Sequence, residues 1–458
     1  MSSTLSSAPA DQLLIAFAQL NPVAGDIAGN VRRVREARAL AGGQGAELLV
    51  FPELFLSGGL PKDRAAPDVI AACRGAVEEL ARDTGEDGPA LVIGAPWVEG
   101  GKLYNAALLL EGGAVAASRF KVELPEDGAE RGVFTPGPMP GPMAFRGVRL
   151  GVPVGDDIAA PDVAECLMET GAEILLVPSA SAYHRDAQDA RLNRVVARVV
   201  ESGLPLAFVN GLGGLGEAVF DGGSFVLNAD RALAVQLPNF QQRVRITRWE
   251  RWADGWRCEE GARAPLLAGD EADYAAGVLG LRDRVEKSAA RGAVLAVSDS
   301  LDDALALVMA VDALGPERVR AVALSFDAPA AEALTDVADL AGALGVRVDR
   351  VPLDPAVAAL EALLTPLAGP AEAEAAAALA SGLRDALLSA LAERLGAQRV
   401  TADGALRHLD PTRRHALAAL RTRWKPAGAL GPDGPVIPTR LLVTNDAKPA
   451  GADDLPSA

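Results

Sequence analysis

The chain has few of the residues that build metal centres or disulfide frameworks. Its 458 residues include only three cysteines and three histidines, scattered along the chain: Cys73, Cys166, Cys258, His184, His408 and His415. Three scattered cysteines do not form a disulfide framework, and neither residue type has the spacing of a zinc motif. The sequence therefore predicts no metal site.

Basic residues are also scarce relative to acidic ones. Lysine and arginine number 44 against 61 aspartates and glutamates, which gives a net charge of −17. Such a chain is repelled by a phosphate backbone and by an anionic membrane surface, so neither nucleic acid nor a membrane is an expected partner. The first residues lack the basic and apolar regions of a signal peptide. With no credible membrane span, a cytoplasmic location is expected.

Short apolar runs alternate with amphipathic stretches through the first half. Residues 13–18 and 47–51 are predicted to be strands, with a helix over 31–44 between them. Further strands are expected at 91–93, 106–110, 148–154, 174–177, 206–209 and 224–227. This alternation favours layered sheets covered by helices within a first domain of residues 1–257.

Repeated strand–helix units indicate a second domain over residues 274–458. Residues 258–273 are rich in acids and contain glycine and proline, which is typical of a linker. Strands are predicted at 293–297, 319–324 and 346–351, and helices at 274–287, 303–314 and 330–344. Such a pattern predicts a doubly wound, Rossmann-like parallel sheet with ligands at the carboxyl ends of its strands.

Motifs in a fixed order connect the first domain with a known family. They are AQLNP at 18–22, GDI at 25–27, FPEL at 51–54, YNAA at 104–107, Lys121 before Leu124-Pro125, and FDGGSF at 220–225. These residues resemble the nitrilase-type glutaminase domain of glutamine-dependent NAD synthetase. The resemblance implies an α-β-β-α sandwich followed by an ATP-pyrophosphatase-type synthetase domain, and it makes a homo-oligomer the expected assembly.

The resemblance also implies a catalytic glutamate, lysine and cysteine. In that family the thiolate attacks the glutamine amide, the glutamate is the base and the lysine stabilises the oxyanion. Glu53 and Lys121 match, but residues 151–158 read GVPVGDDI and place Gly155 where the cysteine is expected. Asp156 is interpreted as an inherited neighbour of this site, and Cys166 is expected to point elsewhere.

Two simpler interpretations of the first site stay open. Glu53 and Lys121 could be the remnant of a ligand site or, equally, a buried ion pair kept for packing. His184 could contact a ligand, although a structural or surface role is favoured.

The phosphate-binding loop expected in the second domain is altered. The family pattern SGGxDS corresponds here to Ser298, Asp299, Ser300, Leu301, Asp302 and Asp303. Glycines let backbone N–H groups close around a phosphate, whereas each carboxylate about 5 Å from a phosphate charge costs about 3 kcal/mol at a dielectric near 20. ATP binding is therefore expected to fail unless magnesium reverses the charge. The aspartates could instead hold a divalent cation or simply cap a helix.

Both altered sites lead to the same functional prediction. The chain is expected to be a catalytically inactive homologue, a pseudoenzyme without cofactors, acting as a scaffold, assembly subunit or regulator. Its expected partner is a second copy, an active NAD synthetase or another protein. The alternatives are an active ammonia-dependent NAD synthetase-like ligase that uses ATP and magnesium, or a non-catalytic sensor of glutamine or a dinucleotide.

Two features of the second domain bear on its extent and assembly. A stripe of leucines at four-residue spacing predicts a core or subunit-interface helix: Leu379, Leu383, Leu387, Leu391 and Leu395. The resemblance further implies that this domain is shortened at its C-terminal end, with residues 453–456 as a trace of the family pattern.

Overall fold

A computed structural model of the chain divides into two compact units, Met1–Leu267 and Ala268–Ala458. The structure describes residues 11–59, 67–126, 128, 130–325, 331–369, 372–406 and 411–443. His408 and residues 453–456 therefore lie outside the described residues. The segment expected to be a linker, 258–273, contains the last residue of β15 (Gly255–Cys258) and the start of α5 (Gly269–Glu286).

Two sheets form the centre of the first unit. Among the described residues, the seven-stranded sheet has the order β15-β14-β1-β2-β3-β4-β5 and the six-stranded sheet the order β13-β12-β9-β8-β7-β6. The remaining strands of the first sheet are β1 (Gln12–Gln19), β2 (Leu48–Val50), β3 (Ala90–Glu99), β4 (Lys102–Glu111), β5 (Ala114–Phe120) and β14 (Arg243–Trp252). Those of the second are β6 (Met143–Phe145), β7 (Val148–Gly151), β8 (Ile174–Ser179), β9 (Leu206–Asn210), β12 (Phe225–Leu227) and β13 (Leu233–Gln236). A separate ribbon pairs β10 (Leu212–Leu215) with β11 (Ala218–Asp221).

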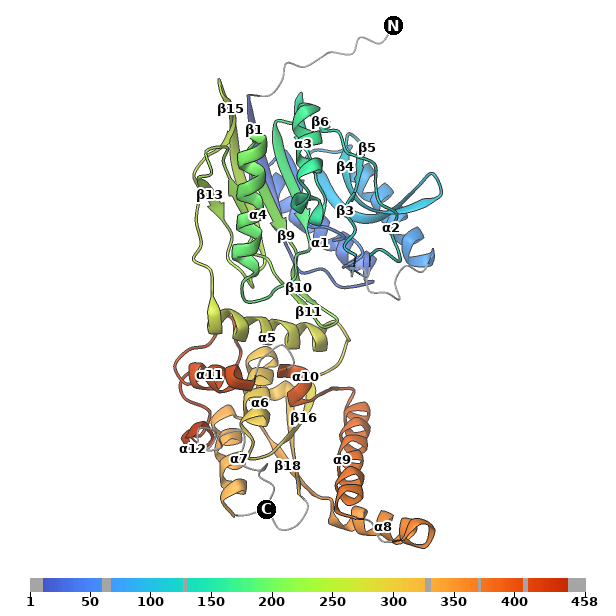
Figure 1. Cartoon of the computed structure of the whole chain (residues 1–458), viewed down its shortest axis with the longest axis vertical. Coiled ribbons are helices and arrows are strands. Elements are labelled where there is room, and N and C mark those ends of the chain that lie inside the picture. The colour runs from blue at the N-terminus through green and yellow to red at the C-terminus, as the bar shows by residue number, and fades with distance from the viewer. Residues whose placement is uncertain are drawn as a thin grey trace, which may run out of the picture. The chain divides into compact units, whose positions relative to one another are not determined.

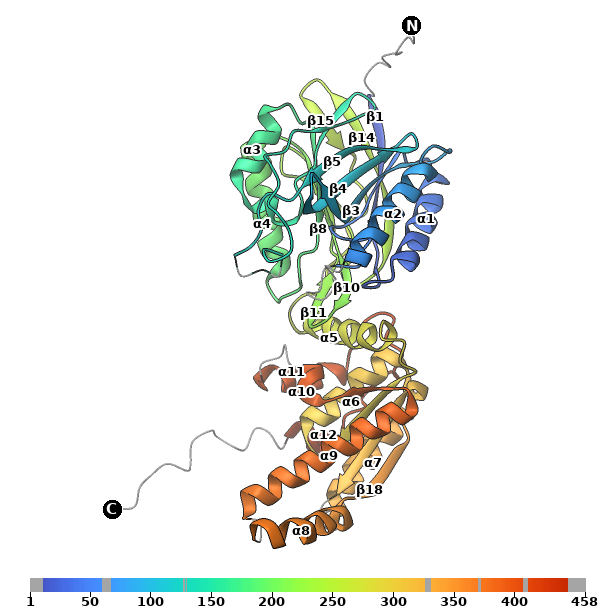
Figure 2. The ribbon, with the colours of Figure 1, turned by 90° about the vertical axis from the view of Figure 1, so that its right-hand side faces the viewer.

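Helices cover the outer faces of both sheets. α1 (Ile27–Gly42) and α2 (Pro67–Asp83) lie on one side, and α3 (Pro161–Glu169) and α4 (Ala187–Ser202) lie on the other, with the strands between them (Figure 2). Successive residues of β1 point to opposite faces: Ile15 packs between the sheets, and Ala16 packs under the helices. Because both faces are buried, the strand is a continuous apolar run. The predicted α-β-β-α sandwich is confirmed.

The second unit contains a parallel sheet with the strand order β18-β17-β16-β19. Its strands are β16 (Ala293–Val297), β17 (Val319–Ser325), β18 (Val348–Pro352) and β19 (Gln398–Val400). Its helices (Figure 1) are α5, α6 (Leu301–Leu314), α7 (Ala331–Leu344), α8 (Asp354–Ala368), α9 (Ala373–Leu395), α10 (Ala402–Leu406), α11 (Pro411–Arg421) and α12 (Thr439–Val443). Leu295 packs on the α6 side and Val294 on the α9 side, so both faces are covered. The predicted doubly wound parallel sheet is confirmed.

The leucine stripe expected from the sequence lies along the edge of the buried face of helix α9, where all five leucines are half-buried. Leu388 and Ala392 are the buried residues, and they pack against Val294 and Val322 of the sheet. Leu391 and Leu395 of the stripe pack against the same cluster. By length and composition alone, α9 is also the one described helix that could cross a membrane, which is a weak indication by itself.

A buried ion pair joins the helices of the second unit. Arg421 of α11 donates from Nε to Asp312 Oδ2 (2.6 Å) and from Nη2 to Asp312 Oδ1 (2.9 Å). The Tyr274 hydroxyl of α5 donates to the same Oδ2 (2.7 Å), and Arg421 Nη2 also reaches the Pro432 carbonyl (2.7 Å). Because Asp312 and Arg421 are 0% and 1% exposed, removing either partner would leave a buried charge without compensation.

We expect Arg421→Met to lower the free energy of unfolding of the second unit by about 3 kcal/mol or more, because it leaves the Asp312 carboxylate buried without a cation. The exposed Arg423→Met, two residues away, should change it by less than about 0.5 kcal/mol. Urea unfolding of the full chain measures both. Equal effects of the two substitutions would contradict the assigned role of the pair.

Candidate functional site

A buried lysine lies among three carboxylates in loops of the first unit. Lys121, directly after β5, donates from Nζ to Glu53 Oε1 (2.9 Å), Glu130 Oε2 (2.6 Å) and Asp156 Oδ2 (3.1 Å). The side chains of Lys121 and Glu53 are 2% and 5% exposed, whereas those of Glu130 and Asp156 are 19% and 49% exposed. All three ammonium hydrogens of Lys121 are therefore taken by carboxylates.

Asn105 of β4 holds two of these carboxylates in place. Its Nδ2 donates to Glu53 Oε1 and to Glu130 Oε1, both at 2.7 Å. The backbone N–H of Ala180, at the end of β8, donates to Glu53 Oε2 (2.9 Å). Glu53 is thus fixed by groups from three different segments of the chain. The Oδ1 of Asn105 is buried without a hydrogen-bond partner in the part of the chain that the structure describes.

The turn that carries position 155 is fixed by Asp157. Its carboxylate accepts from the backbone N–H groups of Val154 (3.0 Å), Val122 (2.9 Å) and Glu123 (2.8 Å). These bonds attach the short helix η2 (Gly155–Ala159) to the segment after β5. Burial raises the pKa of Asp157 to about 7, against the lowering effect of the backbone donors.

Gly155 has the left-handed backbone conformation, with φ of +56°. A Cβ on this residue would lie 2.4 Å from Glu53 Oε2 and 2.6 Å from Oε1. The Glu53 carboxylate therefore lies where any side chain at 155 would begin. Glu53 thus fills the space that a side chain at position 155 would take. The structure does bring Glu53, Lys121 and Gly155 together, as the sequence predicted.

Burial and charge oppose each other within this cluster. Burial raises the pKa of Glu53, and Lys121 only partly offsets that effect. Burial by itself would lower the pKa of Lys121, but Glu53, Asp156 and Glu130 raise it above its usual value. Lys121 is therefore a permanent cation, and it is outnumbered by the carboxyl groups around it.

None of the three cysteines of the chain takes the place of the side chain that is missing at position 155. Cys166 lies on α3 with its Sγ 3.7 Å from the Pro140 carbonyl, and Cys73 and Cys258 are buried. Burial raises the pKa of both buried thiols to about 12, so they stay protonated. His184 is exposed, in line with its surface interpretation.

The altered loop of the second unit joins the carboxyl end of β16 to α6. Ser300 caps α6 by accepting from the Asp303 N–H (3.1 Å), and Ser298 donates to Asp303 Oδ2 (2.7 Å). Asp302 forms an ion pair with Arg414 of α11, and Arg384 of α9 lies 3.7 Å from Asp303. The structure thus gathers Ser298, Ser300, Asp302 and Asp303 at one turn, where two carboxylates have cationic partners. Asp299 is exposed beside them.

Sequence reasoning missed several residues of these sites. Asn105 belongs to the YNAA motif at 104–107, so the motif could have identified it as a candidate site residue. Glu130 is held by Lys121 in a loop without a local pattern, and Arg384 and Arg414 come from distant helices. Among the described residues, no group of three or more His, Cys, Asp or Glu side chains is arranged to hold a metal ion.

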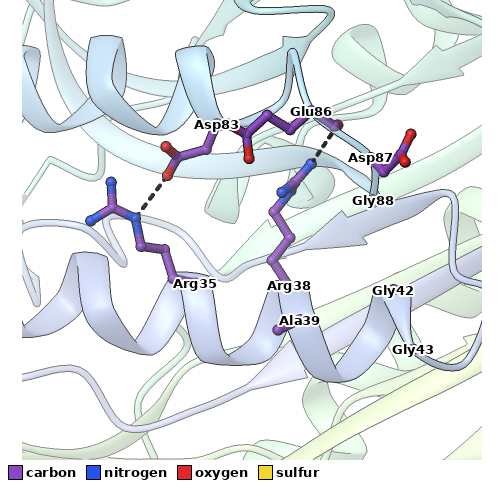
Figure 3. A pocket seen from close by; sticks show the side chains of 9 residues that line it. All are labelled: Arg35, Arg38, Ala39, Gly42, Gly43, Asp83, Glu86, Asp87 and Gly88. Atoms are coloured by element: carbon purple, nitrogen blue, oxygen red, sulfur yellow. Dashed lines mark hydrogen bonds and ion pairs between the residues drawn. The ribbon is translucent and has the colours of Figure 1, made fainter.

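A separate surface hollow of about 500 Å³ lies between α1 and the end of α2 (Figure 3). Its arginines are already engaged: Arg35 donates to Asp83 (2.8 Å) and Glu79 (2.5 Å), and Arg38 donates to the carbonyls of Pro89 and Glu86. It presents no free cationic or nucleophilic group from these side chains, so it is a weaker candidate than the two sites above.

Comparison with known proteins accounts for both units. Residues 14–251 match the carbon-nitrogen hydrolase family and residues 274–401 match the NAD synthase family. The glutamine-dependent NAD(+) synthetase of Rhodobacter capsulatus is 41% identical over 398 residues, which cover 85% of this chain and 71% of that protein. The chain belongs to the glutamine-dependent NAD synthetase family. The Xanthomonas campestris synthetase is 32% identical over 407 residues, covering 85% of this chain and 72% of that protein.

A solved structure of the family agrees with the fold. The structure of the glutamine-dependent NAD+ synthetase of Acinetobacter baumannii in complex with ADP matches this chain with a TM-score of 0.84 and 27% identity. The match covers 96% of this chain and 86% of the Acinetobacter chain. The expectation that the chain needs no cofactor is at odds with a nucleotide bound to this relative.

The prediction of a catalytically inactive homologue is wrong. Identity of 41% to a glutamine-dependent NAD synthetase, over most of both chains, points to an active enzyme. For the second unit, the prediction treated Asp299 and Asp303 as two added carboxylates beside Asp302 that would repel a phosphate. It did not foresee Arg414 and Arg384, which lie beside Asp302 and Asp303 in the fold.

We expect Gly155→Ala to lower the free energy of unfolding of the first unit by about 2 kcal/mol or more. A left-handed non-glycine residue costs about 1–2 kcal/mol, and the added Cβ must also displace the Glu53 carboxylate from its donors. Gly203→Ala is the matched control, since Gly203 has a φ of +66° and a Cβ there meets nothing within 4 Å. Thermal and urea unfolding compare the two; a neutral Gly155→Ala would show that Glu53 is not held in place.

Proposed function

We propose that the chain is an ATP-dependent amide ligase that forms NAD from nicotinic acid adenine dinucleotide with ammonia taken from solution. Its similarity to NAD synthetases in both units supports the ligase reaction. The observation that carries the choice of ammonia is Gly155, which has no side chain and has the Glu53 carboxylate in front of it.

Release of ammonia from glutamine by a nitrilase-type site needs a nucleophile. A thiolate adds to the amide carbon, ammonia leaves, and water hydrolyses the resulting thioester. Gly155 has no atom that can form this bond, and the hydrogens of Lys121 are already donated to Glu53, Glu130 and Asp156. Loss of a covalent nucleophile costs on the order of 10⁶ in turnover. Free ammonia is therefore the proposed nitrogen donor.

The turn between β16 and α6 is the proposed site for the ATP phosphates. Ligands of doubly wound folds bind beyond the carboxyl ends of the strands, where helix N-termini favour anions. Arg414 and Arg384 offset the charge of Asp302 and Asp303, so the repulsion expected from the sequence is reduced. The same arginines could turn toward a phosphate, because guanidinium groups match its geometry.

The oxygen and guanidinium groups at this turn fit a magnesium–nucleotide complex. Asp302 would hold the magnesium ion, as carboxylates commonly do, while Arg414 and Arg384 would meet phosphate oxygens. The carboxylate of the dinucleotide would attack the α-phosphate of ATP and release pyrophosphate. Ammonia would then attack the adenylated carboxyl carbon, expel AMP and lose a proton to leave the amide. The role of this chain is to place the phosphates and to balance their charge.

Self-association stays a prediction. Helix α8 is apolar and has Leu363 and Leu367 exposed at 69% and 84%, which suits a contact with a second copy. The alternative of a non-catalytic sensor has no specific observation in its favour.

The purified chain should form NAD from nicotinic acid adenine dinucleotide, ATP and magnesium when ammonium is supplied. Glutamine at the same concentration should give a rate lower by several orders of magnitude, because Gly155 cannot form the thioester. Chromatographic detection of NAD measures both rates, and release of glutamate from glutamine is measured in parallel. No turnover with ammonium would refute the ligase, whereas equal rates with glutamine would refute only the choice of donor.

Arg414→Gln should raise the KM for ATP about tenfold or more, because it removes a cation that faces the proposed phosphate site and leaves Asp302 unopposed. Arg423→Gln is the control, since Arg423 is exposed and lies nine residues away. Steady-state kinetics with ammonium in excess compare the two. If both variants behave like the parent chain, the phosphates do not bind beside Arg414.

A further inference from the structure

The cluster around Lys121 carries more negative than positive charge. Glu53, Glu130 and Asp156 all accept hydrogen bonds from the Lys121 ammonium, so three carboxylates share one cation. When all three are ionised, the cluster has two negative charges in excess. Charges taken out of water need a partner, and Glu53 is 5% exposed. The cluster is thus short of positive charge.

The same place is short of hydrogen-bond donors. Asn105 is 1% exposed, and its Oδ1 has no hydrogen-bond partner among the described residues. Because its Nδ2 donates to both Glu53 and Glu130, this oxygen lies beside the same carboxylates. Turning the amide over would bring its oxygen against two carboxylates, so the orientation is fixed. A buried acceptor without a donor is unfavourable, since nearly all such groups pair with a protein group, an ordered water or an ion.

We propose that this cluster binds ammonium, non-covalently, as a small cation with N–H donors. A positive charge offsets the surplus carboxylates, and its N–H groups supply the donor that Asn105 Oδ1 lacks. The ligand has to be small, because Glu53 already occupies the place of a side chain at Gly155. Glu130 and Asp156 are partly exposed and offer access from solvent.

A metal ion fits this place less well. The described residues contain no metal-binding arrangement of His, Cys, Asp and Glu side chains. Ammonium differs from potassium in its directional N–H donors, so a comparison of the two ions tests the donor argument. Binding goes beyond the proposed ligase reaction and does not require it, so either idea can fail alone.

The test is the resonance of ¹⁵N-ammonium in the presence of the full chain. Exchange with the protein should broaden it at constant ionic strength, and potassium chloride should compete weakly. Glu130→Gln should weaken binding at least about tenfold, because it removes one charge-assisted acceptor. Glu126→Gln is the matched control, being 84% exposed and four residues away. Asp156→Asn is a second variant should Glu130→Gln not fold.

The outcomes separate clearly. Broadening that Glu130→Gln or Asp156→Asn abolishes and Glu126→Gln leaves intact supports the site. Broadening that is absent, that survives both variants, or that potassium removes as effectively as unlabelled ammonium overturns it. Displacement of ammonium by an equal concentration of glutamine also overturns it, since the site would then accept an amide. Formation of NAD is measured separately and does not enter this decision.

Discussion

The ammonium group of Lys121 is the contact on which the first site depends. It ties together loops that follow β2, β5 and β7, because its three hydrogens reach Glu53, Glu130 and Asp156. With Asn105 and the Ala180 N–H, it holds the Glu53 carboxylate against Gly155. This arrangement leaves no place for a side chain at 155 without moving Glu53. The loss of the nucleophile and the present packing are therefore two aspects of one structure.

The balance of carboxylates and cations differs between the sites of the two units. In the first, carboxylates outnumber the cation, and a buried acceptor has no donor within the part of the chain that the structure describes. In the second, Arg414 and Arg384 face the carboxylates at the start of α6, and the pair of Asp312 and Arg421 is fully enclosed. A ligand that brings positive charge suits the first site, whereas a phosphate with its magnesium ion suits the second. This difference supports a division in which nitrogen and nucleotide are handled by separate units.

Local patterns predicted the fold well and the sites only in part. Periodicity located β1 and β16 because each is a continuous apolar run buried on both faces. Glu53, Lys121 and Gly155 came together because motifs of a known family carried them. Glu130, Arg384 and Arg414 were missed, since their partners lie in distant segments that only the folded chain brings close. The prediction of an inactive protein was wrong in part because it weighed the carboxylates of residues 299–303 without those arginines.

The most direct test supplies both nitrogen donors at once, each with its own label. The chain is given ¹⁵N-ammonium and unlabelled glutamine at equal concentration, with ATP, magnesium and nicotinic acid adenine dinucleotide. The mass of the NAD formed then reports the source of its amide nitrogen. Our account predicts that all the NAD formed carries ¹⁵N in its amide group. NAD with unlabelled nitrogen would show that glutamine is cleaved despite Gly155, and no NAD at all would contradict the ligase itself.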